Sequence, residues 1–297
     1  MSLPDSLAQP LGLLRNSSLI FALAAVLGLG YPSPAKWLEP LITPALFLMM
    51  LFSMTEIDLK ARGDLHGALT GFGINYLLLS GLILGMSFSL KDEALRQGFV
   101  VMAAVPPAIA VLPLSKLLEG DANLSLYAET ICYLASLVLM PAIILLFTGI
   151  AGASFTYIIK IILLLILLPI IGSRFLMKAR IDPVPPINLG FFLVTYIVIG
   201  LNSNSMFGVI PAVAIIAFVR TFLVGGAVYL AAKLAGIQLQ KRISFTLFAS
   251  FKNLGMAAAI SMTIFGPRAS IPAAVCILAE TLFYIFLAAL HDHDSLR

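Results

Sequence analysis

Ten long apolar stretches follow one another along the chain, separated by Gly, Pro or charged residues. An α-helix needs about 20 predominantly apolar residues to cross the hydrocarbon core of a bilayer. We therefore predict ten transmembrane helices, near residues 12–30, 38–55, 66–88, 97–118, 122–149, 155–177, 188–206, 208–232, 243–264 and 270–290. The predicted fold class is an all-α membrane protein, in which residues 1–297 form a single polytopic domain.

The composition agrees with this fold class. Apolar residues make up 61% of the chain and charged residues only 11%, against about 45–50% and about 25% in soluble domains. So little charge argues against a soluble enzyme, a nucleic-acid-binding protein and a disordered chain. The net charge is 18 − 14 = +4, and we interpret it as loop charge that faces the anionic lipid of an inner or plasma membrane.

The basic residues predict how the chain is oriented. If the N-terminus is cytoplasmic, 11 Lys and Arg lie on the cytoplasmic side, 4 lie on the opposite side and 3 fall within spans. The positive-inside bias then places both termini in the cytoplasm, which an even number of helices allows. The segment Met1–Pro10 has no basic region ahead of an apolar stretch, so we expect no cleavable signal peptide.

Motifs for enzymatic or metal chemistry are missing from the sequence. Cys132 and Cys276 both lie in apolar stretches and match no metal-ligand or disulfide spacing. Neither a nucleotide-binding loop nor a catalytic triad is present. We expect no enzyme activity, no metal site, no cofactor and no ATP-driven pumping, and the sequence does not predict the oligomeric state.

A short motif recurs half a chain apart. Residues Ala128–Tyr133 (AETICY) reappear as Ala279–Tyr284 (AETLFY), with an offset of 280 − 129 = 151 residues. The two copies fall on the fifth and the tenth predicted helices. Two halves of five helices each must have opposite orientations in the bilayer, and such inverted repeats are common in secondary transporters. We therefore predict one repeat over about 12–149 and a second over about 155–290.

Secondary transporters of this kind have interrupted helices at matching places in the two halves. The fourth predicted helix contains Pro106, Pro107 and Pro113 within the nine residues Val105–Pro113. Each proline removes a backbone donor, and the carbonyls this frees are tolerated at membrane depth only where they line a protein cavity. The ninth helix carries the polar, Gly-containing stretch Ser250–Gly255. The alternative is that the prolines only kink an ordinary packed helix.

Several ionisable or polar side chains lie inside predicted spans, where a charge costs roughly 2.5–3.5 kcal/mol at the helix centre. They are Lys252, Glu129, Glu280 and Arg220, with the polar Asn75 in the third span. One interpretation is a pathway cluster in which a carboxylate carries protons. The other is a set of structural ion pairs between helices.

The chain resembles the bile acid:sodium symporter family over most of its length. The resemblance is clearest in Trp37–Pro44 (WLEPLITP), Leu48–Met54 (LMMLFSM), Gly120–Ser125 (GDANLS) and Pro141. It implies ten helices in two inverted five-helix repeats, arranged as a panel domain and a core domain. It also implies that the fourth and ninth helices unwind and cross in the core, where sodium drives the transport of an organic anion.

The ninth helix departs from the pattern of that family, Glu-x-Gly-x-Gln-Asn with a glycine two residues later. Asn253 and Gly255 fit the pattern. The acidic sodium ligand of the family falls on Phe248, however, and its glutamine ligand falls on Lys252.

The other sodium ligands implied by the resemblance are also changed. The Ser-Asn pair of the fourth helix falls on about Val111 and Leu112, and Asn75 stands where the family tends to have a glutamine. Apolar side chains offer sodium no oxygen ligand, and an ammonium repels it. We therefore predict that the usual sodium sites are lost and that Lys252 supplies a fixed positive charge near them.

These observations predict a secondary active transporter of a small or amphipathic organic anion that works by alternating access. We expect it to be proton-coupled, through Glu129 or Glu280, or sodium-independent. The alternatives are a sodium-coupled symporter of bile acids or other organic anions, and a transport-inactive membrane receptor on the same fold. The expected partners are the substrate anion and the lipid bilayer. The predicted substrate- and ion-binding residues are Lys252, Asn253, Glu129, Glu280, Asn75, Thr130, Pro106 and Pro113.

Overall fold

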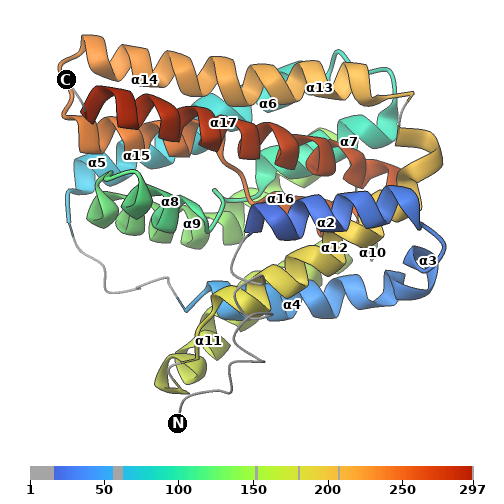
Figure 1. Cartoon of the computed structure of the whole chain (residues 1–297). Coiled ribbons are helices and arrows are strands. Elements are labelled where there is room, and N and C mark those ends of the chain that lie inside the picture. Colours follow the sequence, from blue (N-terminus) through green and yellow to red (C-terminus); the bar gives the residue numbers. More distant parts are fainter. Residues whose placement is uncertain (1–16, 56–62, 151–152, 180, 207, 296–297) are drawn as a thin grey trace.

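The computed structural model describes residues 17–55, 63–150, 153–179, 181–206 and 208–295 (Figure 1). The segment Met1–Pro10 lies outside these residues, and so do five of the basic residues counted on the cytoplasmic side. They are Arg15, Lys60, Arg62, Arg180 and Arg297.

The described residues form helices and connections, without a strand among them. The first half contains α2 (Ser17–Gly30), α3 (Ala35–Leu38), η1 (Glu39–Leu41), α4 (Ile42–Ser53), α5 (Leu65–Gly73), η2 (Ile74–Leu79), α6 (Ser80–Ser87), α7 (Glu93–Ala104), α8 (Val111–Leu117) and α9 (Ala122–Thr148). The second half contains α10 (Ala153–Ile162), η3 (Leu163–Leu167), α11 (Leu168–Ala179), α12 (Val184–Met206), α13 (Ile210–Phe218), η4 (Val219–Leu223), α14 (Val224–Leu234), α15 (Leu239–Ser250), α16 (Leu254–Phe265), η5 (Pro267–Ser270) and α17 (Ile271–Ser295).

Eight segments of the described residues are long and apolar enough to cross a membrane, where the sequence predicts ten. The two predicted spans outside this set are the first and the fourth. In the first, the described helix α2 has 14 residues. In the fourth, the helix is divided into α7 and α8, of 12 and 7 residues. The other eight predicted spans match the described segments to within a few residues.

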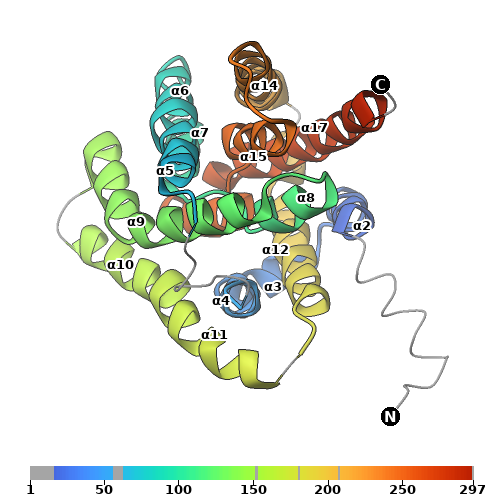
Figure 2. The ribbon, with the colours of Figure 1, turned by 90° about the vertical axis from the view of Figure 1, so that its left-hand side faces the viewer.

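The helices pack in two groups (Figures 1 and 2). In one group, α12 packs against α2 and α4, and α4 packs against α11. In the other, α9 packs against α5 and α7, α14 packs against α15, and α17 packs against α13 and α16. Figure 2, which looks along α4 and α14, shows α4 with the first group and α14 with the second. The groups meet where α16 contacts α4 and α12.

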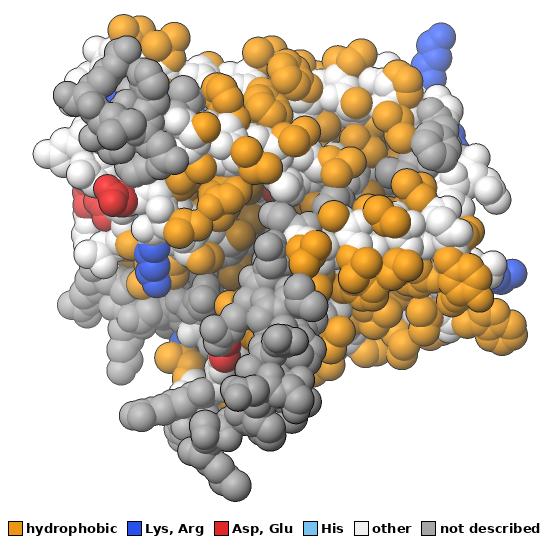
Figure 3. Space-filling model, in the orientation of Figure 1, with side chains coloured by type: hydrophobic (Ala, Val, Ile, Leu, Met, Phe, Trp, Pro, Cys, Tyr) orange, Lys and Arg blue, Asp and Glu red, His pale blue; other side chains and the backbone are white. Residues whose placement is uncertain are grey.

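The outer surface is apolar. Figure 3 shows hydrophobic side chains gathered over the upper and right-hand parts of the visible face, with only a few charged side chains, most of them near its left and right edges. Large apolar side chains on helices of both groups are exposed, among them Leu77, Val138, Leu146 and Phe175. An exposed apolar area of this extent is the surface expected of a protein that faces lipid. The chain is therefore an integral membrane protein.

The fourth and ninth predicted helices are both interrupted in the structure. The chain leaves α7 at Val105, which is extended (φ −68°, ψ 154°), and re-enters a helix at Val111. Pro106 and Pro107 lie in this break, because a proline has no N–H for the helical hydrogen bond and disfavours helical geometry in the residue before it. A second break separates α15 from α16 at Phe251–Asn253.

Within the described ranges, three pairs of helices are joined end to end by a π-helical turn into one continuous rod. These are α5–α6 with η2, α10–α11 with η3 and α13–α14 with η4. Short π-helical turns occur often at functional sites. η2 carries Asn75 and η4 carries Arg220, two of the polar residues that the sequence places inside spans.

Candidate functional site

The two helix breaks touch each other. The backbone N–H of Asn253, in the second break, donates to the carbonyl of Pro106 in the first, at 2.9 Å. Residues of both breaks are buried. Every broken helix leaves unpaired carbonyls at one end and unpaired N–H groups at the other. Side chains from neighbouring helices converge on these groups and form the candidate site.

Lys252 lies at the centre of this site, and its side chain is fully buried. Its ammonium donates to four oxygen atoms. These are Asn75 Oδ1 at 2.9 Å, Ser80 Oγ at 2.8 Å, the carbonyl of Val105 at 2.9 Å and the carbonyl of Ala103 at 3.3 Å. The two carbonyls belong to the C-terminal end of α7, where the helix dipole favours a cation. The ammonium thus sits in a cage of oxygen atoms of the kind that binds a free cation.

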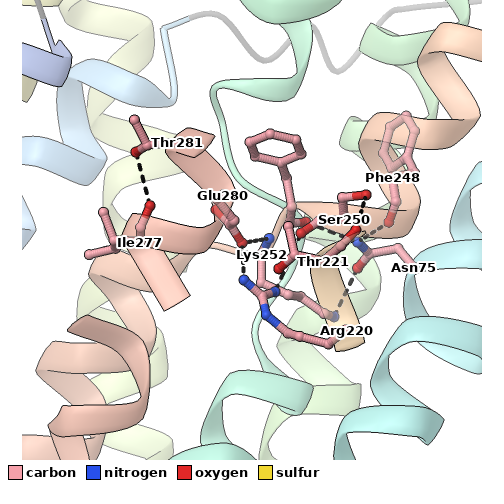
Figure 4. A network of polar contacts seen from close by, with 10 residues as sticks. Asn75, Arg220, Thr221, Phe248, Ser250, Lys252, Ile277, Glu280 and Thr281 are labelled. Carbon is pink, nitrogen blue, oxygen red and sulfur yellow. Dashed lines mark hydrogen bonds and ion pairs between the residues drawn. The ribbon is translucent and has the colours of Figure 1, made fainter. Parts of the chain in front are cut away.

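Asn75 connects the cage to the second break. Its Oδ1 accepts from Lys252, and its Nδ2 donates to the carbonyls of Phe248, at 2.8 Å, and Phe251, at 3.3 Å (Figure 4). A single buried amide therefore satisfies carbonyls that the end of α15 leaves free. An amide has both donors and acceptors, which is what a position between an ammonium and two carbonyls requires.

Glu280 and Arg220 form an ion pair beside the same break. Arg220 is fully buried and Glu280 is 7% exposed, and the guanidinium donates to Glu280 Oε1 at 2.6 Å. The same oxygen accepts the backbone N–H of Lys252 at 3.0 Å, and Arg220 also donates to the carbonyl of Ser250 at 3.4 Å (Figure 4). The pair supports the backbone on both sides of Phe251.

Asn253 forms the beginning of α16 and faces the other group of helices. Its Oδ1 accepts from the N–H of Met256 at 3.0 Å, which is an N-cap contact. Its Nδ2 donates to Tyr133 Oη at 2.9 Å and contacts the sulfur of Met50, on α4, at 3.7 Å. The hydroxyl of Tyr133 in turn donates to the carbonyl of Pro107 at 3.1 Å.

The remaining predicted residues occupy different places. Pro106 belongs to the site through its carbonyl, whereas Pro113 lies in the first turn of α8 with an exposed ring. Thr130 donates to the carbonyl of Leu126 in its own helix, at 2.8 Å. Glu129 is buried on α9, one turn before Tyr133.

Sequence reasoning missed three side chains of the site. Ser80 and Tyr76 lie near Asn75 on the same rod. The hydroxyl of Ser80 accepts from the ammonium, and the centroid of the Tyr76 ring lies 4.5 Å from Lys252 Nζ. Tyr133 follows Glu129 by one helical turn. A helical projection of the fifth span would have placed Tyr133 on the face of Glu129. Ser80 follows Asn75 by five residues, so only the π-helical turn brings the two to the same face, and α-helical spacing gives no signal for it.

Among the residues searched, which are those that the structure describes, no group of three or more His, Cys, Asp or Glu side chains is arranged to hold a metal ion. The oxygen atoms around Lys252 are amide, hydroxyl and carbonyl oxygens, and the ammonium itself fills the space between them.

The fold and the site define a polytopic helical membrane protein in which two interrupted helices meet at a buried charged centre. No family model matches the chain. Over 272 residues the chain is 24% identical to the uncharacterized sodium-dependent transporter YocS of Bacillus subtilis (strain 168). The match covers 84% of this chain and 83% of that protein, so it extends over both groups of helices.

Proposed function

We propose that this protein is a secondary transporter that moves a small or amphipathic organic anion across the membrane by alternating access. Its similarity to a transporter along most of the chain supports transport in general. The buried charged centre between two helix breaks supports a substrate pathway, because ionisable groups inside a membrane usually line one. The same similarity favours transport over an enzyme activity.

We infer an inverted repeat of two five-helix halves within one transporter domain. The rod α5–α6 and the rod α13–α14 run in opposite directions in Figure 1, and each contains a π-helical turn. Thr130 and Thr281, from the two copies of the repeated motif, each donate to the carbonyl four residues earlier. We assign the panel to the group with α2, α4, α11 and α12, and the core to the group that contains both breaks.

Both termini are cytoplasmic in this proposal. Two ion pairs agree with the topology that the basic residues predict. Asp64 pairs with Lys241, and the prediction assigns both to the cytoplasmic side. Asp92 pairs with Arg268, and the prediction assigns both to the opposite side.

One observation carries the proposal that transport is sodium-independent. The ammonium of Lys252 lies within 3.3 Å of four oxygen atoms at the C-terminal end of α7 and on the third span. A sodium ion at this place would have to displace a charge that is covalently tethered there. The three N–H groups of the ammonium are directed at these oxygens, so Lys252 attracts an anionic substrate through its charge rather than by direct contact.

Proton coupling in this proposal rests on Glu129. Glu280 is bound to the guanidinium of Arg220 and to the Lys252 amide, so a proton on it would break the ion pair. Glu129 is buried one turn from Tyr133, which contacts Asn253 at the second break.

A sodium-coupled symporter is the second candidate, because the relative is described as a sodium-dependent transporter. The two candidates differ in whether the free ion binds. In the sodium-coupled case the ion binds at a place other than the oxygen cage, or the ammonium leaves the cage during the cycle.

The test compares wild type with Lys252→Gln and Lys252→Arg. A thiol-reactive fluorophore reports unfolding of the detergent-solubilised protein, since Cys132 and Cys276 are buried until it unfolds. We expect wild type and Lys252→Arg each to unfold at the same temperature in NaCl as in choline chloride. We expect sodium to stabilise Lys252→Gln, because the empty cage then offers its oxygen atoms to a free cation.

Flux in proteoliposomes completes this test, with radiolabelled taurocholate and pyruvate as an amphipathic and a small organic anion. Wild-type uptake should be the same with and without a sodium gradient. Uptake that requires sodium, or a wild-type protein that sodium stabilises, would establish the sodium-coupled alternative instead. Binding of either anion without flux would indicate a receptor.

A further inference from the structure

Arg220 contacts the end of a broken helix, as Lys252 does. It reaches α15 from η4, which lies in the α13–α14 rod that directly precedes α15 in sequence, and its side chain has no exposed surface. Its guanidinium donates to the carbonyl of Ser250, the last residue of α15, and to the carboxylate of Glu280. The carbonyl end of a helix carries a partial negative charge, so a cation is stabilised there.

At both breaks, therefore, a cationic side chain lies against the C-terminal end of the interrupted helix. The C-terminal end of α7 receives the ammonium of Lys252, through the carbonyls of Ala103 and Val105. The C-terminal end of α15 receives the guanidinium of Arg220. Each half-helix that ends inside the protein thus has a cation against its free carbonyls, and in both cases this cation is a side chain of the same polypeptide.

Two of the groups around Arg220 offer oxygen ligands to a cation. They are the Glu280 carboxylate and the Ser250 carbonyl. Both are hard oxygen ligands of the kind that alkali and alkaline-earth cations prefer. The buried carboxylate needs a positive partner in any conformation that keeps it out of water.

We propose that Arg220 fills a second, latent monovalent-cation site, formed by Glu280 and the carbonyl end of α15. This inference rests on the proposed function, because it extends the tethered-cation arrangement from one break to both. Its consequence is that neither break has room for a free alkali ion. Movement of the substrate then takes its energy from the substrate's own gradient, from exchange for a second anion or from protons, and not from an alkali-metal gradient.

Arg220→Gln is the test variant, because it removes the charge and leaves the carboxylate and carbonyl in place. Arg220→Lys keeps a tethered cation, and Arg220→Gln/Glu280→Gln removes both the cation and its anionic ligand. Unfolding is followed with the thiol-reactive fluorophore in NaCl, LiCl and choline chloride at equal ionic strength. The inorganic salts are the probes, so no substrate is needed.

We expect NaCl or LiCl to raise the unfolding temperature of Arg220→Gln by about 3 °C or more over choline chloride, once the ion exceeds its dissociation constant severalfold. Wild type, Arg220→Lys and the double variant should show no such difference. The same unfolding temperature for Arg220→Gln in all three salts would overturn the proposal. So would an equal response in the double variant, because the ion would then bind elsewhere.

If Arg220 and Glu280 form only a structural ion pair, Arg220→Gln should be less stable than wild type by the same amount in all three salts. If that variant is too unstable to purify, the yields after extraction in LiCl and in choline chloride replace the unfolding temperature. A higher yield in LiCl supports the proposal, and equal yields contradict it. Sodium stabilisation of wild type would instead contradict the proposed function, while the comparison of Arg220→Gln with Arg220→Lys would still decide whether Arg220 masks a cation site.

Discussion

Lys252 carries an ammonium that is fully buried. Burial of an ammonium is unfavourable unless acceptors surround it. Here the acceptors exist because a helix ends beside it, so that the break in α7 and the charge of Lys252 stabilise each other. Truncation of any acceptor leaves part of the ammonium unsatisfied. The stability of the site should therefore depend on each acceptor in proportion to the number of polar partners it holds.

Asn75 tests this dependence. Asn75→Leu removes the acceptor of Lys252 and the donor to the carbonyls of Phe248 and Phe251. Each buried partner left unsatisfied costs about 1–3 kcal/mol, so we expect a loss of roughly 3 kcal/mol or more, a fall of about 6–12 °C in the unfolding temperature.

Ser80→Ala is the matched control for Asn75→Leu, since its hydroxyl accepts from Lys252 and donates to the carbonyl of Ala103. We expect it to lose only about 1 kcal/mol, because the Ala103 carbonyl still accepts from the ammonium and Lys252 keeps three other acceptors. Thermal unfolding in detergent measures both variants. Equal stability of the two would mean that Asn75 does not hold the break together.

At the residue scale the sequence predicts which charged side chains are buried inside the spans, but not how they pair. The membrane cost of a charge singles out Lys252, Arg220, Glu129 and Glu280 from the sequence alone. Their partners lie far away along the chain, and Asn75 is 177 residues from Lys252. Several of the acceptors are backbone carbonyls, which every residue has, so no side-chain pattern marks them.

At the scale of the elements, the breaks are the most predictable feature. Prolines forbid a continuous helix at Val105–Pro107, and the polar stretch around Lys252 marks the second break. The π-helical turns carry no comparable signal, because their sequences are ordinary apolar helix sequences. They insert one residue per turn and so change the direction of Asn75 and Arg220, which explains why helical spacing alone did not predict their contacts.

The N-terminal end of α7 leads to a prediction, at the scale of the elements, about how stability depends on pH. Asp92 caps α7 by accepting from the N–H of Leu95 and pairs with Arg268 beyond α16, at 2.7 Å. Partial burial would raise the pKa of Asp92, but the hydrogen bond from Arg268 and that from the Leu95 amide outweigh it and hold the pKa below the ordinary value of 3.8. A lowered pKa means that this stabilisation is complete above about pH 4 and is lost as the pH falls through the folded-state pKa.

Circular dichroism melting curves between pH 3 and pH 7 check this expectation. The unfolding temperature of wild type should fall more steeply below pH 4 than that of Asp92→Asn, which keeps a capping oxygen but has no charge to lose. Parallel curves for the two proteins would show that the Asp92–Arg268 pair does not contribute to stability.

At the scale of the whole molecule, the sequence predicts a helical membrane protein and the positions of eight spans to within a few residues, because hydrocarbon thickness fixes the length of an apolar helix. The grouping of the helices is less predictable. A lipid-facing surface and a helix interface are both apolar, so composition does not separate the faces of α4 or α12. Contacts between halves depend on packing of similar side chains that no short motif specifies.

The proposed inverted repeat leads to a prediction about topology that the two halves must satisfy together. The connection after α6 and the connection after α14 occupy corresponding positions in the proposed repeats, and the two rods run in opposite directions in Figure 1. Ser89 lies in the first connection and Ala235 in the second, and both are exposed. Two halves inserted in opposite senses must place these residues on opposite sides of the membrane, with Ala235 on the cytoplasmic side that the basic residues predict.

Ser89→Cys and Ala235→Cys, each expressed in intact cells, measure this directly with a membrane-impermeant maleimide. We expect Ser89→Cys to react in intact cells and Ala235→Cys to react only after the membrane is opened. The unsubstituted protein is the control, because Cys132 and Cys276 are buried and should stay unlabelled in both conditions. Labelling of both introduced cysteines from the same side would mean that the halves are parallel. The meeting of the two breaks would then need an explanation other than inverted symmetry.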